Sequence, residues 1–195
     1  MSFWTVEGKE GLTPKFKDRF VVIIGGDIRL NAKSVTKPVL TFDNKEYKMM
    51  NHHFKFPGLP KWNSIKIVFV DLDGEGDIKA ANKDTWSAAS FLRTLVHDGG
   101  YEGHDNRSTP SKSTMIDSIG DIRIQQISHS KLDNNGKASK EGKIRVVEQW
   151  TLINPLIKSV DWGQLSYSDD GLVEYTLELD YDYAVMTNEN QGIGG

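Results

Sequence analysis

The sequence has no cysteine among its 195 residues. Disulfide bridges and thiolate zinc sites are therefore excluded, and assembly inside a cell fits. No apolar run approaches the roughly 18 residues that a membrane-spanning helix needs. The first residues lack a basic stretch followed by an apolar one, so we expect no signal peptide. These absences predict a soluble protein whose stability comes from an ordinary hydrophobic core.

The C-terminal part of the chain lacks basic residues. No lysine or arginine follows Lys158, although eight of the 27 acidic residues do. The rest of the chain therefore carries 19 acids against all 24 bases. This division indicates either a solvated acidic face or a surface that repels a polyanion or meets a basic partner.

Sequence patterns of catalysis are also missing. GxSxG, GxGxxG and GxxxxGK[ST] do not occur, which removes local support for a nucleophile elbow or a phosphate-binding loop. The five histidines form no HxH or HxxxH pair. We therefore predict no enzymatic activity and no cofactor.

One acidic segment is similar to a calcium-binding loop. "DLDGEGDIKAAN" places carboxylates at ligand positions and a glycine at the sharp turn. Its last position is Asn82, where a bidentate glutamate is expected, and a strand precedes it instead of a helix. An exposed acidic turn is the favoured alternative. The weak calcium candidates are Asp71, Asp73, Glu75 and Asp77.

Apolar alternation predicts strands along most of the chain. Residues 20–24 and 28–30 flank a Gly25-Gly26 turn, and residues 64–70 place Ile65, Ile67 and Phe69 on one face. Two further strands, "GDIRIQQISH" and "KIRVVEQWTLI", form a hairpin with a long tip. One helix is predicted from Thr85 to Asp98, with Asp84 as its cap. The fold class is mainly β: an antiparallel sandwich or small barrel with one flanking helix.

The chain divides into three parts. Residues 1–18 form an N-terminal extension, residues 19–186 a single β domain and residues 187–195 a flexible tail. Long loops are expected around residues 43–61, 100–118 and 131–143, the first because of its turn-rich composition and its prolines.

"GLVEYTLELDYDYAVM", residues 171–186, shows the cleanest alternation. Its apolar row predicts a single strand with one buried face. The opposite face carries acids with no base among them, and their spacing suits an extended surface rather than a catalytic pair. The apolar row is Val173, Tyr175, Leu177, Leu179, Tyr181, Tyr183 and Val185, and the acids are Glu174, Glu178, Asp180 and Asp182.

The segment "WTLINPLIKSVDWGQLSYSDDGLVEYTLELDYDYA" resembles the C-terminal part of tail tube proteins of contractile-tailed bacteriophages. "SVTKPVLTF" and "NHHFKFPGLPKWNSIKIVFVDL" are similar to the middle of that family. The resemblance runs from about residue 19 to residue 185 and is carried by many modest positions rather than by one motif.

The resemblance implies a hexameric ring whose inner strands join into one continuous β-barrel. Rings would stack into a hollow tube inside a contractile sheath and form the conduit for DNA ejection. The implied partners are further copies of the chain, the sheath protein, baseplate tube-initiator and tail-terminator proteins, and a tape-measure protein in the lumen. The implied location is the virion tail, after assembly in the host cytoplasm, and DNA would pass through the tube without specific binding.

Two groups of residues are candidates for roles in such a tube. Glu174, Glu178, Asp180 and Asp182 are expected to face the lumen, where a wall without cations would not retain DNA. The basic hairpin tip and the loop from Lys45 to Lys61 are candidates for contacts between rings, with mobile, solvated loops as the alternative. The candidate stacking residues of the tip are Lys131, Asn134, Asn135, Lys137, Lys140 and Lys143.

Other interpretations stay open. A baseplate tube-initiator, a tail terminator or the tube of a phage-like contractile injection system would have the same fold. A carbohydrate-binding or hydrolytic β-sandwich belongs to a different class, and would draw its aromatic residues from Trp62, Trp86, Trp150 and Trp162.

Overall fold

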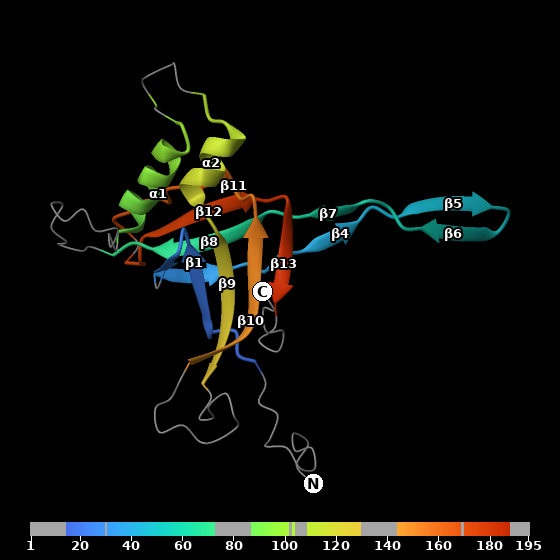
Figure 1. Cartoon of the computed structure of the whole chain (residues 1–195), viewed down its shortest axis with the longest axis horizontal. Helices are drawn as coiled ribbons and strands as arrows, with labels where there is room; N and C mark the ends of the chain where they lie inside the picture. The colour runs from blue at the N-terminus through green and yellow to red at the C-terminus, as the bar shows by residue number, and fades with distance from the viewer. Residues whose placement is uncertain are drawn as a thin grey trace, which may run out of the picture.

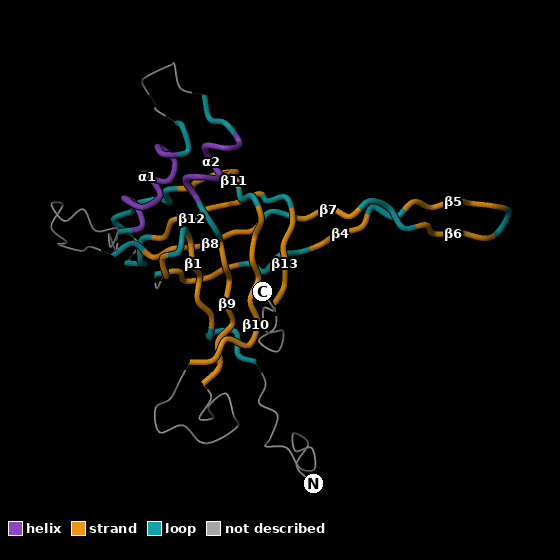
Figure 2. Tube along the Cα trace, viewed as in Figure 1, coloured by secondary structure: helices purple, strands orange, loops and turns teal. Residues whose placement is uncertain are grey.

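The computed structural model describes residues 15–29, 31–72, 87–101, 103, 109–129, 144–168 and 170–187. Two antiparallel sheets form the body of the molecule (Figure 1), and the tube view in Figure 2 shows a long two-stranded arm that leaves it. Neither sheet closes into a barrel among the described strands. The prediction of a mainly β, antiparallel fold is confirmed, and the architecture is an open sandwich.

The first sheet has five strands in the order β13-β10-β9-β1-β2. The predicted strand–turn–strand segment opens it, because Gly25 and Gly26 both adopt positive φ in the tight turn between β1 and β2. The predicted pairing of β9 with β10 is also confirmed. The strands are β1 (Phe20–Ile24), β2 (Asp27–Arg29), β9 (Ile122–His129), β10 (Ile144–Ile153) and β13 (Tyr183–Thr187).

The second sheet has four strands in the order β11-β12-β8-β3. Alternation along β8 buries Ile65, Ile67 and Phe69, as the sequence predicts. These side chains meet Leu177 and Leu179 of β12 and the inner face of the first sheet in one core. The strands are β3 (Ala32–Val35), β8 (Ile65–Val70), β11 (Leu156–Asp161) and β12 (Glu174–Asp180).

The described residues form two helices, rather than the single predicted one, and these lie together at one end of the sheets. Helix α1 (Ala88–Asp98) begins later than predicted, because Ser87 is its cap and accepts a hydrogen bond from the Ser90 N–H. Helix α2 (Lys112–Ile119) occupies part of the expected 100–118 loop. Its polar composition gives no apolar period from which a helix could be predicted, since Ile119 is its one buried residue. No described helix is both long and apolar enough to cross a bilayer.

The arm occupies the expected 43–61 loop, so that expectation is wrong. Strands β4 (Leu40–Phe42) and β7 (Pro60–Trp62) form its base, and β5 (Lys45–Met49) and β6 (His52–Phe56) form its outer hairpin. The prolines lie between β6 and β7 and at the start of β7, where a missing N–H does not disrupt the outer ladder. The turn-forming residues thus lie between two short ladders and do not prevent the strands from forming.

The single strand expected over residues 173–185 is divided between the two sheets. β12 ends at Asp180, and the backbone N–H of Asp182 then donates to the carbonyl of Ile153 while the chain crosses to the other sheet as β13. Leu177, Leu179 and Tyr181 are buried, but Tyr183 and Val185 are exposed. The apolar row therefore does not form one buried face.

Candidate assembly surfaces

In the folded protein, the predicted lumen-facing acids Glu174 and Glu178 form ion pairs with lysines. Glu174 forms an ion pair with Lys33 of β3, and Glu178 forms one with Lys158 of β11 at 2.8 Å. Both lysines come from strands that neighbour β12 or β8 in the sheet and are remote in sequence. The expectation of an unanswered acidic face is wrong because residues on one strand meet their partners across the sheet.

Glu178 is held by several polar neighbours. Its carboxylate accepts hydrogen bonds from the Lys158 ammonium and from the Ser64 hydroxyl, both at 2.8 Å, and the strand register places Lys66 opposite it. The bond from Lys158, followed by the one from Ser64, lowers the pKa of Glu178 to about 2. The same contact raises the pKa of Lys158. Glu178 is therefore ionised throughout the neutral range.

The two remaining acids differ in position. Asp180 lies at the exposed end of β12, whereas Asp182 lies in the crossing between the sheets. Asp182 accepts a hydrogen bond from the Asn154 side chain at 2.7 Å and pairs with Lys112 of α2 at 2.9 Å. These contacts lower the pKa of Asp182, Asn154 contributing most. Asp182 thus links α2 to the segment that crosses between the sheets. It does not extend the face of β12 that carries Glu174 and Glu178.

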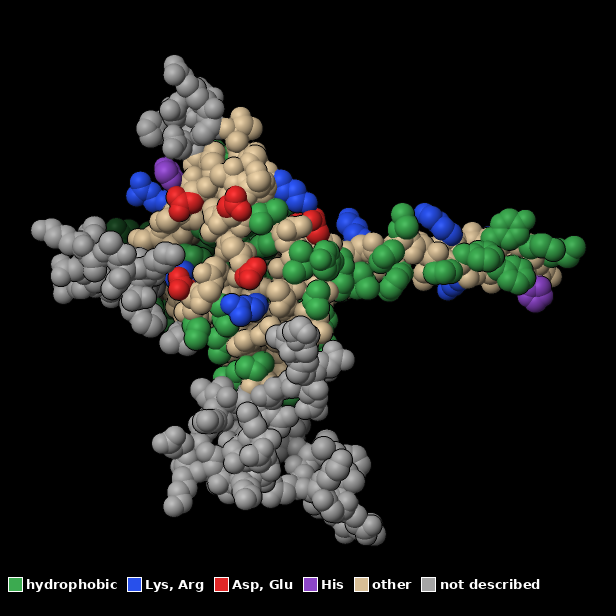
Figure 3. All heavy atoms as spheres, viewed as in Figure 1, with side chains coloured by type: hydrophobic (Ala, Val, Ile, Leu, Met, Phe, Trp, Pro, Cys, Tyr) green, Lys and Arg blue, Asp and Glu red, His purple; other side chains and the backbone are tan. Residues whose placement is uncertain are grey.

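The arm has two unlike faces. The register of β5 with β6 puts Tyr47, Met49, Phe54 and Phe56 on one side, and all four are exposed. The other side is polar, and His53 there contacts the Glu46 carboxylate. Figure 3 shows hydrophobic side chains along the arm. An isolated two-stranded ribbon is at best marginally stable in water, so this exposed apolar side is a candidate contact surface.

Gly58 fixes the joint between the two parts of the arm. A Cβ atom at this position would lie 1.6 Å from the backbone oxygen of Asp43. No L-residue with a side chain fits there unless the backbone moves. The close approach of the segments around Asp43 and Gly58 therefore depends on this glycine.

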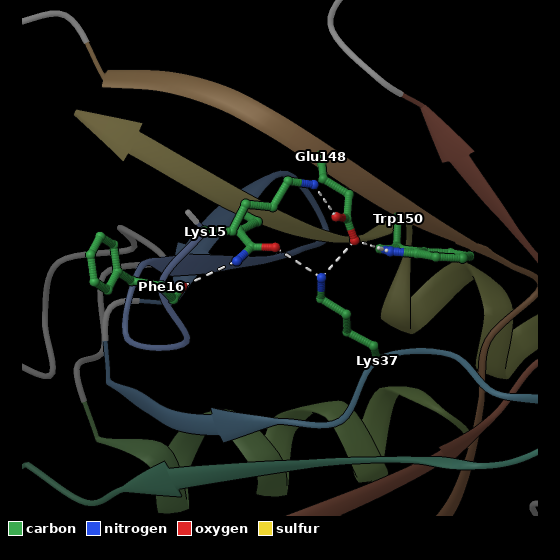
Figure 4. Close-up of polar contacts among 6 residues, drawn as sticks. Lys15, Phe16, Lys37, Glu148 and Trp150 are labelled. Carbon is green, nitrogen blue, oxygen red and sulfur yellow. Dashed lines mark hydrogen bonds and ion pairs between the residues drawn. The ribbon is translucent and has the colours of Figure 1, made fainter. Parts of the chain in front are cut away.

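A polar cluster that the sequence does not reveal lies on the inner side of β10. Glu148, only 9% exposed, accepts hydrogen bonds at 2.6 Å from Lys15 and from Lys37, and at 2.7 Å from the Trp150 indole (Figure 4). Lys37 also donates to Gln126 at 2.9 Å. The cluster connects β10 and β9 with the segment that follows β3.

The electrostatics of this cluster favour an ionised carboxylate. Burial alone would raise the pKa of Glu148, but the hydrogen bonds from Lys15, Lys37 and Trp150 together outweigh it and lower the pKa to about 2. The β-bulge between Val146 and Glu148 shifts the alternation of β10. From Glu148 onward the alternation is regular and places Glu148 on the same face as Trp150 and Leu152. What the sequence does not reveal is the approach of Lys15 and Lys37, which are remote from it in the chain.

A hollow of about 630 Å³ adjoins Glu148, with Phe20, Val35, Ile124 and Trp150 among its lining residues. Lys17 and Lys33 stand at the same site. Both oxygens of the Glu148 carboxylate accept hydrogen bonds, so the arrangement joins the two sheets.

The calcium prediction is only partly accessible to the structure. Asp71 is described, and its carboxylate accepts hydrogen bonds from the Ala88 N–H at 2.9 Å and from the Tyr175 hydroxyl at 3.3 Å. It therefore supports the start of α1. Asp73, Glu75 and Asp77 lie outside the described residues. Among the described residues, no three His, Asp or Glu side chains gather in a way that could hold a metal ion.

The predicted stacking residues of the 131–143 tip also lie outside the described residues, so that assignment stays a prediction. The described tryptophans are separated by their neighbours: Trp62 packs near Tyr181, Trp150 donates to Glu148, and Trp162 packs near Tyr175. Trp86 lies outside the described part. The described indoles do not form one aromatic platform for a sugar.

No family model matches the sequence, and no curated protein does. Solved structures do match the fold. A chain of the anti-feeding prophage tube-terminating cap aligns with a TM-score of 0.58 at 15% identity, covering 96% of this chain and 99% of that one.

Two further structures agree with it. A chain of the sheath/tube terminator of the extracellular contractile injection system PVC, in its extended state, has a TM-score of 0.55 at 16% identity and covers 90% and 98% of the two chains. A chain of the PVC sheath–tube complex has a TM-score of 0.53 at 15% identity and covers 90% and 92%. The resemblance predicted from the sequence is thus confirmed for the fold: this chain has the fold found in tube and terminator assemblies of contractile injection systems.

Proposed function

We propose that this protein is a structural subunit of a tail tube, whose hexameric rings stack into a hollow tube inside a contractile sheath. The observation that carries the proposal is the projecting arm, which exposes an apolar face along Tyr47, Met49, Phe54 and Phe56. A monomer would leave this face in water, whereas self-assembly would cover it. The fold shared with components of contractile injection systems supports the same role.

The four-stranded sheet supports ring closure. Its outer strands, β11 and β3, each have one edge without a described neighbouring strand. Such edges invite pairing with another chain, and a closed ring removes them. Six copies would supply about 24 strands; at about 4.8 Å spacing and about 40° tilt these give a backbone diameter near 48 Å. A tube of this size accommodates a DNA duplex.

The outward face of this sheet is the proposed lumen wall, with Glu174, Glu178 and Asp180 on it and Asp182 at its end. The ion pairs change the physical reason for this assignment. Lys33 and Lys158 are occupied by carboxylates on the same face, so they are poor partners for phosphate. Lys66 of β8 lies on the same face, opposite Glu178. Because DNA retention depends on released counterions at available cations, carboxylates beside these lysines weaken the hold of the wall on a polyanion.

The partners in this proposal are other copies of the chain, a sheath protein, the tube-initiator and terminator rings that end the tube, and a tape-measure protein in the lumen. The particle would be a phage tail or a phage-like injection system, assembled in the host cytoplasm. A terminator ring is a second candidate, favoured by the fold match to a tube-terminating cap and to a sheath/tube terminator.

Electron microscopy of the purified protein tests the proposal. Hollow tubes with six-fold symmetry are expected in negative stain, and single rings would favour the terminator instead. A protein that stays monomeric at every concentration, or that turns over a sugar, would contradict both and favour the carbohydrate-active sandwich. Cryo-EM of the tube then decides the lumen assignment, which fails if Glu174 and Glu178 face the sheath.

A further inference from the structure

The arm and the loop of residues 162–173 lie at opposite ends of β8. The arm joins the body at the Ile65 end, through β7. At the other end Val70 pairs with Glu174, and the N–H of Asp71 donates to the carbonyl of Val173. In Figure 1 the arm accordingly extends from one side of the body. One chain therefore cannot bring its own arm to this loop.

The tip of the arm presents an unusual side chain. Met50 is 94% exposed and has a φ of 53°, a conformation that favours glycine. A large apolar residue in such a position is strained and gains nothing from water. Its side chain indicates a contact outside the chain, continuous with the apolar face of the arm.

The 162–173 loop is a matching apolar surface. Leu165, Tyr167 and Leu172 have relative exposures of 85%, 113% and 73%. They line a hollow of about 390 Å³ together with Val173. Gly163 holds the loop close to β12, because a Cβ there would lie 2.6 Å from the Glu174 carbonyl oxygen. The loop is thus a built surface that leaves its largest side chains open.

The charges of the two surfaces are complementary. The arm carries Lys45, Lys48, Lys55 and Lys61 against Asp43 and Glu46. From residue 159 to residue 173 the sequence contains Asp161, Asp169 and Asp170 and no lysine or arginine. Opposite charges at the rim of an apolar contact fix its register and speed its formation. Two arms facing each other would instead bring lysines together.

We propose that the arm of one copy docks on the 162–173 loop of a second copy, with Met50 and the face of Tyr47, Met49, Phe54 and Phe56 against the hollow. The inference rests on the proposed tube function and identifies the contact that builds it. Because each copy uses a different surface on its two sides, the contact is heterologous and continues from copy to copy. Such a contact generates a ring or a stack rather than a closed dimer.

Cysteine cross-linking tests this contact directly, because the natural chain has no cysteine. Met50→Cys and Leu172→Cys are purified separately, mixed, assembled and oxidised, and the products are separated without reductant. A cross-linked dimer is expected only in the mixture. Met50→Cys mixed with Ser113→Cys, an exposed position on α2, is the matched control and should stay uncross-linked.

The outcomes distinguish the arm-to-loop contact from an arm-to-arm contact and from failure of the tube function. Cross-linking of Met50→Cys with itself would show arms meeting arms and overturn the proposal. Tubes in the microscope without the mixed cross-link would overturn it while leaving the tube function intact, whereas monomers without tubes would remove the function and the contact together. Met50→Gly supplies a second test: it relieves the strained backbone, so the monomer should remain folded while the critical assembly concentration rises at least about tenfold.

Discussion

The body of this molecule buries an aromatic side chain of the kind that its arm exposes to solvent. Phe69 is fully buried between the two sheets, whereas Phe54 on the arm is half exposed. Both lie on strands with apolar alternation, and in the body a second sheet covers that face while no described residue does so on the arm. The comparison teaches that alternation identifies a face that needs covering but does not say whether the cover belongs to the same chain.

The joint of the arm offers the largest expected effect. Gly58→Ala should abolish tube assembly, because a Cβ would overlap the Asp43 carbonyl and redirect the outer hairpin. The free energy of unfolding of the body should be nearly unchanged. Electron microscopy and urea unfolding followed by circular dichroism measure the two effects. Gly103→Ala is the matched control, since its Cβ would make only an ordinary 3.7 Å contact with Tyr101. Normal tubes from Gly58→Ala would show that the arm is dispensable.

Matched truncations sharpen the contrast between the two phenylalanines. Phe69→Ala should lower the free energy of unfolding by about 3–5 kcal/mol, because it leaves a cavity in the core. Phe54→Ala should lower it by less than about 1 kcal/mol and should instead weaken assembly. Urea unfolding of the dissociated subunits measures both. Equal losses of stability would mean that the arm belongs to the folding core.

The Glu148 cluster should have an intermediate effect. Glu148→Gln removes the charge that two lysines share and should cost about 1–3 kcal/mol in unfolding free energy. The folded-state pKa of about 2 lies below the ordinary value of 4.5. The carboxylate therefore stabilises the fold above pH 4.5, and this contribution disappears as the pH falls towards 2. Stability measured from pH 6 to pH 2 should fall less in Glu148→Gln than in the natural protein; parallel curves would contradict this.

The surface pair of Glu174 with Lys33 should matter least for stability. Lys33→Met should change the free energy of unfolding by less than about 1 kcal/mol, because exposed ion pairs contribute little. If the face lines the lumen, the variant should leave tube formation intact as well. A loss of several kcal/mol, measured by urea unfolding, would show that the pair does more than balance charge.

Much of the body was predictable from its sequence because its rules are local. Gly25-Gly26 specifies a tight turn, and alternation at Ile65, Ile67 and Phe69 specifies a buried strand face. The ion pairs at Glu174 and Glu178 were not predictable, since Lys33 and Lys158 reach them only through the strand order of the sheet. Alternation over residues 173–185 predicts one continuous strand, because nothing local marks Asp182 as the point where the chain changes sheets.

The sequence does not predict the arm or α2, for different reasons. Turn residues around Pro57 and Gly58 concealed two short ladders whose pairing depends on the backbone approach at Asp43. Helix α2 has too few apolar residues to show a period. The Glu148 cluster was not predictable for another reason: alternation puts Glu148 on the same face as Trp150, but its partners Lys15 and Lys37 come from distant parts of the chain.

The Glu148 cluster also has a mechanical meaning. Lys37 lies just before β4 begins, at the root of the arm, while Glu148 belongs to the opposite sheet. The β4 root of the arm is therefore tied to the opposite sheet by a charged hydrogen bond, while the β7 root continues directly into β8. In a tube that is driven through a barrier, such an anchor would spread axial force over both sheets. We expect Glu148→Gln to lower the force at which a single subunit yields in force spectroscopy, and an unchanged force would contradict this.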